Sequence, residues 1–266
     1  MRKENVSSNA EIKTKAKEAL KGNWGVAIAS CIIYGLLLQG FSFVINMRDL
    51  TINGFTDALE NSNGDFKSSI IVLLINVFLA GAMTYGLNNF FIKLIRRENA
   101  DIKDVFEGFK HYKGTFFINL LLLIYQFLWA LMFIVPVVII LIIAVVSVAT
   151  DNISITAILL VCLVIIVVSI VLSIILFRYS MSFYIYIDNP ELTASEVIKE
   201  SIDMMEGNQI RLFKLYLSFI LWFLLSIITL GIAMIWVGPY MQTCTAVFYE
   251  ELKDEGWNSA DINNIF

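Results

Sequence analysis

The sequence predicts an all-α, polytopic membrane helix bundle that forms a single integral membrane domain over residues 1–266. Of the 266 residues, 58% are hydrophobic and only 16% are charged, whereas soluble domains carry about 25% charged residues. The mean hydropathy is +0.77, and several uncharged stretches are long enough to cross a bilayer. The 35 aromatic residues exclude a disordered chain, and a net charge of −4 argues against nucleic-acid binding.

Six uncharged segments predict six transmembrane helices, because about 20 apolar residues cross a hydrocarbon core of roughly 30 Å. A polar turn at 150–152 separates the third segment from the fourth. The last uncharged run contains Gly231, where we expect a tight turn between two spans. The expected spans are 24–47, 68–91, 114–150, 152–177, 209–230 and 232–249.

Two of these spans leave alternatives open. Pro136 lies within the third run, and proline removes a helical hydrogen bond, so it marks either a kink or the boundary between two shorter passes. The fourth run stays apolar beyond Arg178 as far as Ile187, which favours a long, kinked or tilted helix.

The lysines and arginines predict that both termini lie in the cytoplasm. With six spans, the outer loops keep only Arg48 and Lys67, and the inner segments hold the other 17 of the 19 basic residues. This positive-inside pattern is typical of multi-pass proteins of the plasma membrane. A division at Pro136 would move residues 178–214 outside and spoil the pattern, so six spans are favoured.

A threefold pattern precedes the odd-numbered spans, where a short amphipathic helix is followed by a glycine. The three glycines are 92 and 93 residues apart: Gly22, Gly114 and Gly207. The pattern predicts three units, each an interfacial helix followed by a hairpin of two spans, and the alternative is a coincidental spacing. The units are 8–97, 100–187 and 192–252.

Signals for helix initiation support the three interfacial helices. Two capping boxes and one N-cap residue are expected: Ser8 with Glu11, Thr193 with Glu196, and Asp101.

Two stretches, KEALKGNWG (17–25) and the continuous segment 179–252, carry a more specific signal. The residues concerned are Gly22, Asn23, Trp24, Gly207, Asn208, Ser218, Trp222, Thr229, Gly231, Trp236, Pro239, Tyr240, Phe248 and Tyr249. In these residues the chain resembles a bacterial integral membrane family known as domain of unknown function 975, found mainly in Gram-positive bacteria. More distantly, its layout is similar to the membrane portion of some glycerophosphodiester phosphodiesterases, without their soluble catalytic domain. The resemblance implies a membrane fold and location but no activity.

The sequence offers no catalytic, cofactor-binding or metal-binding residues. His111 is the only histidine, and without a nearby cysteine or second histidine it cannot form a zinc site of usual composition. No Ser-His-Asp arrangement, GxSxG turn, P-loop or GxGxxG motif is present, and no pair of acids lies in a span. We therefore expect a protein that is not an enzyme and uses no cofactor.

Arg178 is the strongest single candidate for a functional residue, because it is the only charge in the fourth apolar stretch. Its guanidinium either extends to a lipid phosphate or pairs with Asp188 or Glu250. The sequence Ala82-x-x-x-Gly86 predicts close helix packing. Further structural candidates are Gly22, Asn23, Gly207, Asn208, Pro239 and Tyr240. Aromatic residues expected at the membrane interface are Trp24, Trp222, Trp236, Tyr179, Tyr184 and Tyr240.

These features favour a non-enzymatic membrane protein that acts in envelope maintenance or assembly. Its expected partners are membrane lipids and a membrane protein or a second copy, and not nucleic acid. The alternative is a small transporter or lipid-handling channel, and a lipid-headgroup enzyme is the third reading. A water-filled cavity that reaches Arg178 would favour transport, whereas a filled core would favour the first reading.

Overall fold

The computed structural model describes residues 8–40, 62–149 and 155–254, and every element in these ranges is a helix. The expected outer loop before residue 62, the turn at 150–152 and the C-terminal tail lie outside the described residues. The elements, with 3-10 helices marked η, are α1 (Asn9–Leu20), an unlabelled helix (Trp24–Gly40), α3 (Ser62–Ile95), η1 (Ile102–Phe109), α4 (Tyr112–Ala149), α5 (Ile155–Leu176), η2 (Phe177–Tyr179), α6 (Ser182–Asp188), α7 (Ala194–Met205), α8 (Gln209–Leu217), α9 (Ile220–Ile228) and α10 (Met234–Asp254).

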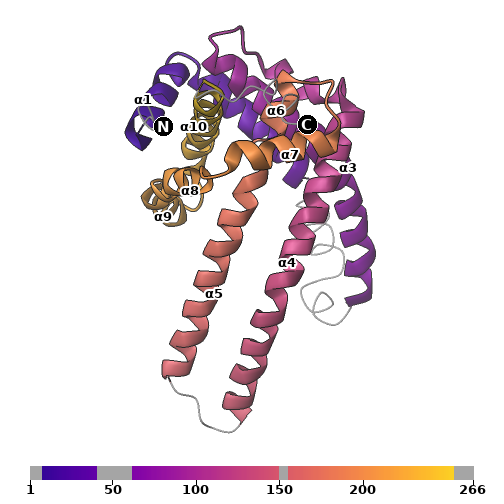
Figure 1. Cartoon of the computed structure of the whole chain (residues 1–266), viewed down its shortest axis with the longest axis vertical. Coiled ribbons are helices and arrows are strands. Elements are labelled where there is room, and N and C mark those ends of the chain that lie inside the picture. Colours follow the sequence, from indigo (N-terminus) through magenta and orange to yellow (C-terminus); the bar gives the residue numbers. More distant parts are fainter. Residues whose placement is uncertain (1–7, 41–61, 150–154, 255–266) are drawn as a thin grey trace.

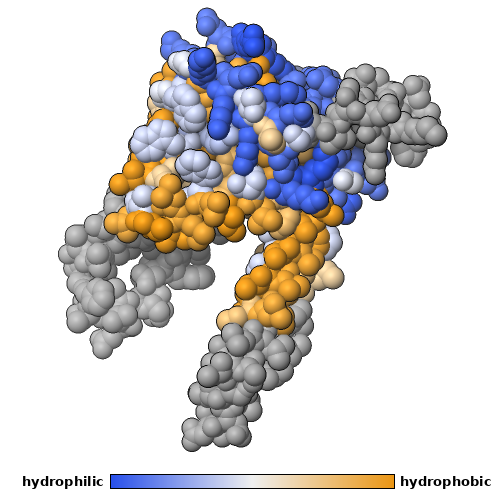
Figure 2. All heavy atoms as spheres, turned by 90° about the vertical axis from the view of Figure 1, so that its left-hand side faces the viewer, coloured by the Kyte–Doolittle hydropathy of each residue, from blue (hydrophilic) through white to orange (hydrophobic). Residues whose placement is uncertain are grey.

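The molecule has a packed end and an extended apolar end (Figure 1). We call the packed end the head, which consists of α1, η1, α6, α7 and the carboxyl-terminal halves of α3 and α10. Its core contains large, fully buried side chains such as Phe90, Met181 and Tyr249. The long helices α4 and α5 extend away from the head. Hydrophilic residues cover the head, whereas hydrophobic residues cover the parts that extend from it (Figure 2).

Three stretches among the described residues are long and apolar enough to cross a membrane: Tyr112–Ile134, Val161–Asp188 and Gln209–Ile228. A fourth is present if α1 and the Trp24–Gly40 helix, which meet at 98°, count as one broken span. Helix α4 continues without interruption over its 38 residues, so the described chain is not divided at Pro136.

The fourth apolar run is long enough to cross a membrane, as expected, but its helix is interrupted near Arg178. α5 ends at Leu176, and Arg178 lies in the short 3-10 turn η2 before α6 begins. Ser201 of α7 supports this break through its hydroxyl group. The hydroxyl donates to the carbonyl oxygen of Arg178 (2.9 Å) and accepts from the backbone N–H of Met181 (3.2 Å). A side chain distant in sequence therefore satisfies backbone groups that the break releases.

The predicted helix starts are confirmed. Ser8 and Glu11 form a capping box at α1, with a 2.7 Å bond from the backbone N–H of Ser8 to the Glu11 carboxylate. Thr193 and Glu196 form the same box at α7. Asp101 is the N-cap of η1 and accepts a 2.7 Å hydrogen bond from the backbone N–H of Ile102. These local signals fix the beginnings of all three short helices.

The close packing predicted from Ala82-x-x-x-Gly86 is confirmed, and its partner is η1. A Cβ atom at Gly86 would lie 1.8 Å from the carbonyl oxygen of Val105. In return, a Cβ atom at Gly108 of η1 would lie 1.9 Å from the carbonyl oxygen of Ala82. The two backbones are thus in direct contact, which only glycine at both positions permits.

The predicted aromatic belt is only partly present. Trp222 and Trp236 are 46% and 53% exposed, as residues facing lipid headgroups would be. Tyr179, Tyr184 and Tyr240 are instead buried in the core. Their rings pack against other aromatic rings, since stacked and edge-to-face pairs stabilise a core beyond their buried area.

Candidate functional site

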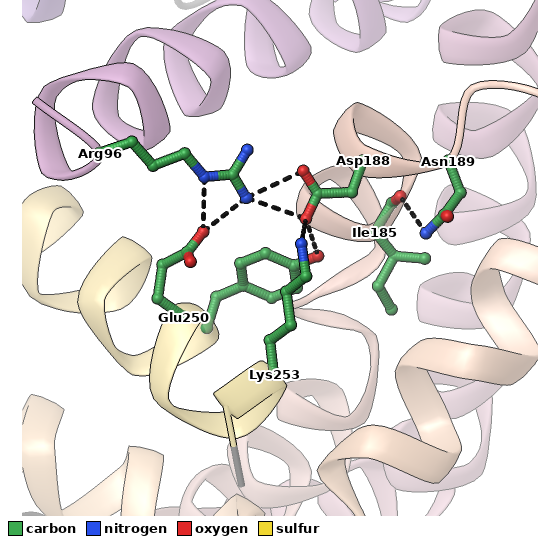
Figure 3. Close-up of polar contacts among 7 residues, drawn as sticks. Arg96, Ile185, Asp188, Asn189, Glu250 and Lys253 are labelled. Carbon is green, nitrogen blue, oxygen red and sulfur yellow. Dashed lines mark hydrogen bonds and ion pairs between the residues drawn. The ribbon is translucent and has the colours of Figure 1, made fainter. Parts of the chain in front are cut away.

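The most connected group of charged side chains lies in the head, where α3, α6 and α10 end (Figure 3). Arg96, the residue after α3, donates from Nε and Nη2 to one oxygen of Glu250, at 3.0 and 2.6 Å. The same Nη2 atom lies 2.9 Å from the carboxylate of Asp188. Asp188 also accepts from Lys253 Nζ (2.6 Å) and from the Tyr249 hydroxyl (2.8 Å). We call these five residues the ion-pair cluster.

The cluster joins segments that are far apart in the sequence. Arg96 is separated from Asp188 by 92 residues and from Glu250 by 154. The side chains are 28%, 11% and 23% exposed, so solvent screens their charges only in part. Two positive and two negative groups balance, and the arrangement ties three helix ends together.

The electrostatics favour the charged form of Arg96. Burial alone would lower the pKa of Arg96, but the charges of Asp188 and Glu250 outweigh it and hold this pKa above its ordinary value. The two carboxylates therefore hold Arg96 in its charged form, which the ion pairs between the three helix ends require.

A second group of ion pairs holds η1 against α3. Lys93 Nζ lies 2.8 Å from Asp104 and 3.0 Å from Glu107, and Asn89 donates to the same Glu107 carboxylate. Burial opposes the charge of Glu107, but the hydrogen bond and charge of Lys93 keep the pKa of Glu107 below its usual range. These bonds lie beside the glycine contact and reinforce it.

A pocket of about 340 Å³ adjoins the ion-pair cluster. It is enclosed by α1 and by the carboxyl ends of α3 and α10, with both acidic and basic side chains in its wall. Its lining includes Arg96, Arg97, Glu250 and Glu251, but not Arg178. None of the residues that line this pocket comes from the long apolar helices α4 and α5.

The predicted junction residues form two similar turns. Gly22 follows α1 with φ +87°, and Gly207 follows α7 with φ +77°, the left-handed conformation that glycine favours after a helix. The next residues, Asn23 and Asn208, accept the first hydrogen bond of the following helix through their carbonyl groups. Gly114, the expected third junction, instead lies inside α4, where a Cβ atom would clash with the hydroxyl of Tyr186.

Pro239 and Tyr240 lie in α10 and are buried. The hydroxyl of Thr243 donates to the carbonyl oxygen of Pro239 (2.7 Å). The Tyr240 hydroxyl donates to the carbonyl oxygen of Lys13 in α1 (3.3 Å), and its ring packs edge-on against Phe219. Tyr240 therefore helps to position α1 on α10, whereas the contact of Pro239 lies within α10.

Of the two contacts considered for Arg178, the ion pair with Asp188 or Glu250 is not formed among the described residues, because Arg96 binds both acids. The contact with a lipid phosphate stays a prediction. The Nε atom of Arg178 is buried and has no hydrogen-bond partner among the described residues. Sequence reasoning missed Arg96, although the 92-residue interval from Arg96 to Asp188 equals the interval from Gly22 to Gly114.

The described residues contain no group of three or more His, Cys, Asp or Glu side chains that could hold a metal ion. His111 is exposed, and its ring approaches the rings of Tyr85 and Tyr186 rather than a carboxylate.

The fold and the site define an all-helical protein with three or four candidate membrane spans and an ion-paired head. A family model described as "Protein of unknown function (DUF975)" matches residues 1–256. The chain belongs to this family. No curated protein and no solved structure matches it.

Proposed function

We propose that the chain is a non-enzymatic protein of the bacterial plasma membrane that crosses the bilayer six times with both termini in the cytoplasm. The basic residues support this orientation, because the head carries most of the lysines and arginines of the described chain. Figure 2 supports it as well, since the hydrophilic surface lies on the head and a hydrophobic surface begins directly below it.

The convergence of the unit ends supports three consecutive units. Arg96, Asp188 and Glu250 lie at or near the ends of units 8–97, 100–187 and 192–252, and they meet in one cluster. The matching capping boxes and positive-φ glycines of α1 and α7 relate the first unit to the third. In this proposal the repeat brings the ends of three hairpins together at the ion-pair cluster in the head.

We further propose that the protein acts in assembly within the cell envelope, by presenting α4 and α5 to partner helices. One observation carries this proposal: the most apolar stretches of these helices are only 11% and 0% buried within the chain, whereas the head is tightly packed. Side chains such as Phe127 (64% exposed) and Ile166 (56%) need a covering of lipid or protein. The transporter alternative needs a cavity that reaches Arg178, which is not among the residues that line the pocket in the head.

The topology can be tested by cysteine labelling of intact cells. In a variant without Cys31, Cys162 and Cys244, an impermeant thiol reagent should modify S62C, which lies outside, and spare S195C, which lies in the head. Both should react after the membrane is permeabilised. The reverse pattern in intact cells would disprove the six-span orientation.

The assembly role can be tested by photo-crosslinking in the native membrane. A photoreactive residue at Ile166 in α5 should give a discrete protein adduct, because this side chain is 56% exposed. The same residue at Ile198, which is 2% exposed in α7, is the matched control and should give none. Adducts to lipid alone at position 166 would contradict a role in protein assembly.

A further inference from the structure

Two lysines of α1 lie over aromatic rings at the boundary between the hydrophilic and hydrophobic surfaces. Lys13 Nζ is 4.4 Å from the ring centroid of Phe219, and Lys17 Nζ is 5.7 Å from that of Tyr240. The two rings themselves pack edge-on with centroids 5.2 Å apart. Because Lys13 and Lys17 are four residues apart on a helix, both ammonium groups project from one face of α1.

Among the residues that the structure describes, no carboxylate lies within ion-pair distance of these two ammonium groups. Lys13 donates to the carbonyl oxygen of Ser218 at 3.1 Å, a neutral acceptor at the end of α8. Within the described ranges, neither lysine forms an ion pair with a carboxylate. Burial lowers the pKa of Lys13 from its ordinary value and the charge of Lys17 lowers it further, although the nearby Cys244 opposes this shift.

An exposed apolar surface begins directly beside the lysines. Phe219 is followed in the chain by Ile220, Leu221 and Trp222, which are 51%, 73% and 46% exposed. Trp236, one turn before Tyr240 on α10, is 53% exposed. The face that carries α1, α8 and α9, on the left in Figure 1 and toward the viewer in Figure 2, changes from hydrophilic above to hydrophobic below.

From this geometry we infer that Lys13 and Lys17 form a binding site for the phosphate headgroup of an anionic phospholipid. The ammonium groups neutralise the phosphate, and the acyl chains lie along the exposed residues of α9 and α10. A zwitterionic lipid brings its own ammonium group, which the two lysines repel. A soluble anion has no acyl chains and would leave the adjoining apolar surface uncovered. This inference rests on the proposed orientation, which places α1 at the inner leaflet.

Lipid binding to the purified full-length protein tests the site. Native mass spectrometry in detergent would follow titration with phosphatidylglycerol and, separately, with phosphatidylcholine. The wild-type protein should retain phosphatidylglycerol preferentially. In the K13Q/K17Q variant we expect about 30-fold weaker retention of phosphatidylglycerol, since each basic residue near an anionic headgroup contributes about fivefold.

Two matched variants separate charge at this site from general effects. K13R/K17R keeps both charges and should bind phosphatidylglycerol like the wild-type protein. K103Q/K113Q removes two exposed lysines from η1 and α4 and should also behave like the wild-type protein. Equal binding by K13Q/K17Q and K103Q/K113Q would overturn the inference.

A thermal-stability measurement distinguishes a lipid phosphate from free inorganic phosphate as the ligand. Phosphatidylglycerol should raise the melting temperature of the wild-type protein, whereas inorganic phosphate at the same concentration should not. An equal effect of inorganic phosphate would overturn the lipid assignment. The cysteine labelling described above is independent of this result: labelling of S195C from outside would disprove the orientation even if K13Q/K17Q abolishes lipid binding.

Discussion

Replacing Gly86 by alanine should remove most of the folded protein from the membrane. The new Cβ atom would lie 1.8 Å from the backbone carbonyl oxygen of Val105, and no flexible side chain can move aside to relieve the contact. α3 and η1 must separate, which would also pull Lys93 away from Asp104 and Glu107. We expect a destabilisation of more than about 4 kcal/mol, in the range of severe core disruption. Fluorescence-detected size-exclusion chromatography of detergent extracts would measure the folded yield.

Gly35→Ala is the matched control for this experiment. Gly35 also lies in a long apolar helix, but a Cβ atom there would have no atom within 4 Å. Alanine has the higher helix propensity, so this variant should keep or slightly increase the folded yield. Gly108→Ala should fail as Gly86→Ala does, because its Cβ atom would meet the carbonyl oxygen of Ala82. Normal folded yields of both Gly86→Ala and Gly108→Ala would show that the backbones of α3 and η1 are not in contact.

The substitution Arg96→Gln should have the second largest effect, because it removes the group that joins three helix ends. Glu250 would lose both of its hydrogen bonds from Arg96, and Asp188 would keep only Lys253 and Tyr249. Breaking a fully buried pair costs about 3–5 kcal/mol, and partial exposure of these side chains reduces the expected loss to about 2 kcal/mol. Thermal unfolding in detergent would measure the change.

Arg97→Gln is the control for Arg96→Gln, since Arg97 is the adjacent residue and is exposed. This variant should unfold within about 0.5 kcal/mol of the wild-type protein. The double variant R96Q/E250Q should lose less than the sum of the single variants, because the two side chains interact directly. Additive losses would show that Arg96 and Glu250 do not stabilise the protein as a pair.

Local signals in the sequence predicted the helix starts and the close packing well. Ser8 with Glu11 and Thr193 with Glu196 form capping boxes that involve only four consecutive residues, so no distant contact can alter them. The turn at Gly231 was also predicted, from a glycine within the last uncharged run. In the structure Gly231 has φ +90°, and residues 229–233 are not helical. Ala82-x-x-x-Gly86 predicted a close helix contact, but the sequence did not identify Gly108 as a residue of the partner helix.

Contacts between distant residues explain what the sequence did not reveal. The break at Arg178 depends on the hydroxyl of Ser201, and a hydropathy pattern carries no information about such a bond. The ion pair with Asp188 or Glu250, one of the two contacts considered for Arg178, is made by Arg96 instead, because Arg96 lies between the two acids beyond the end of α3. Tyr184 and Tyr240 were expected at the interface from their position near the ends of apolar runs, but the head buries them.

The wide sequence separation within the ion-pair cluster sets an order of events during synthesis. Arg96 leaves the ribosome 154 residues before Glu250, which corresponds to roughly 8–30 s at a translation rate of about 5–20 residues per second. During this time the first hairpin has no anionic partner from α10, and α1 also waits for Glu251, 236 residues after Lys15. The growing chain must therefore hold its early helices in the membrane without these ion pairs, and the head closes only after α10 has been synthesised.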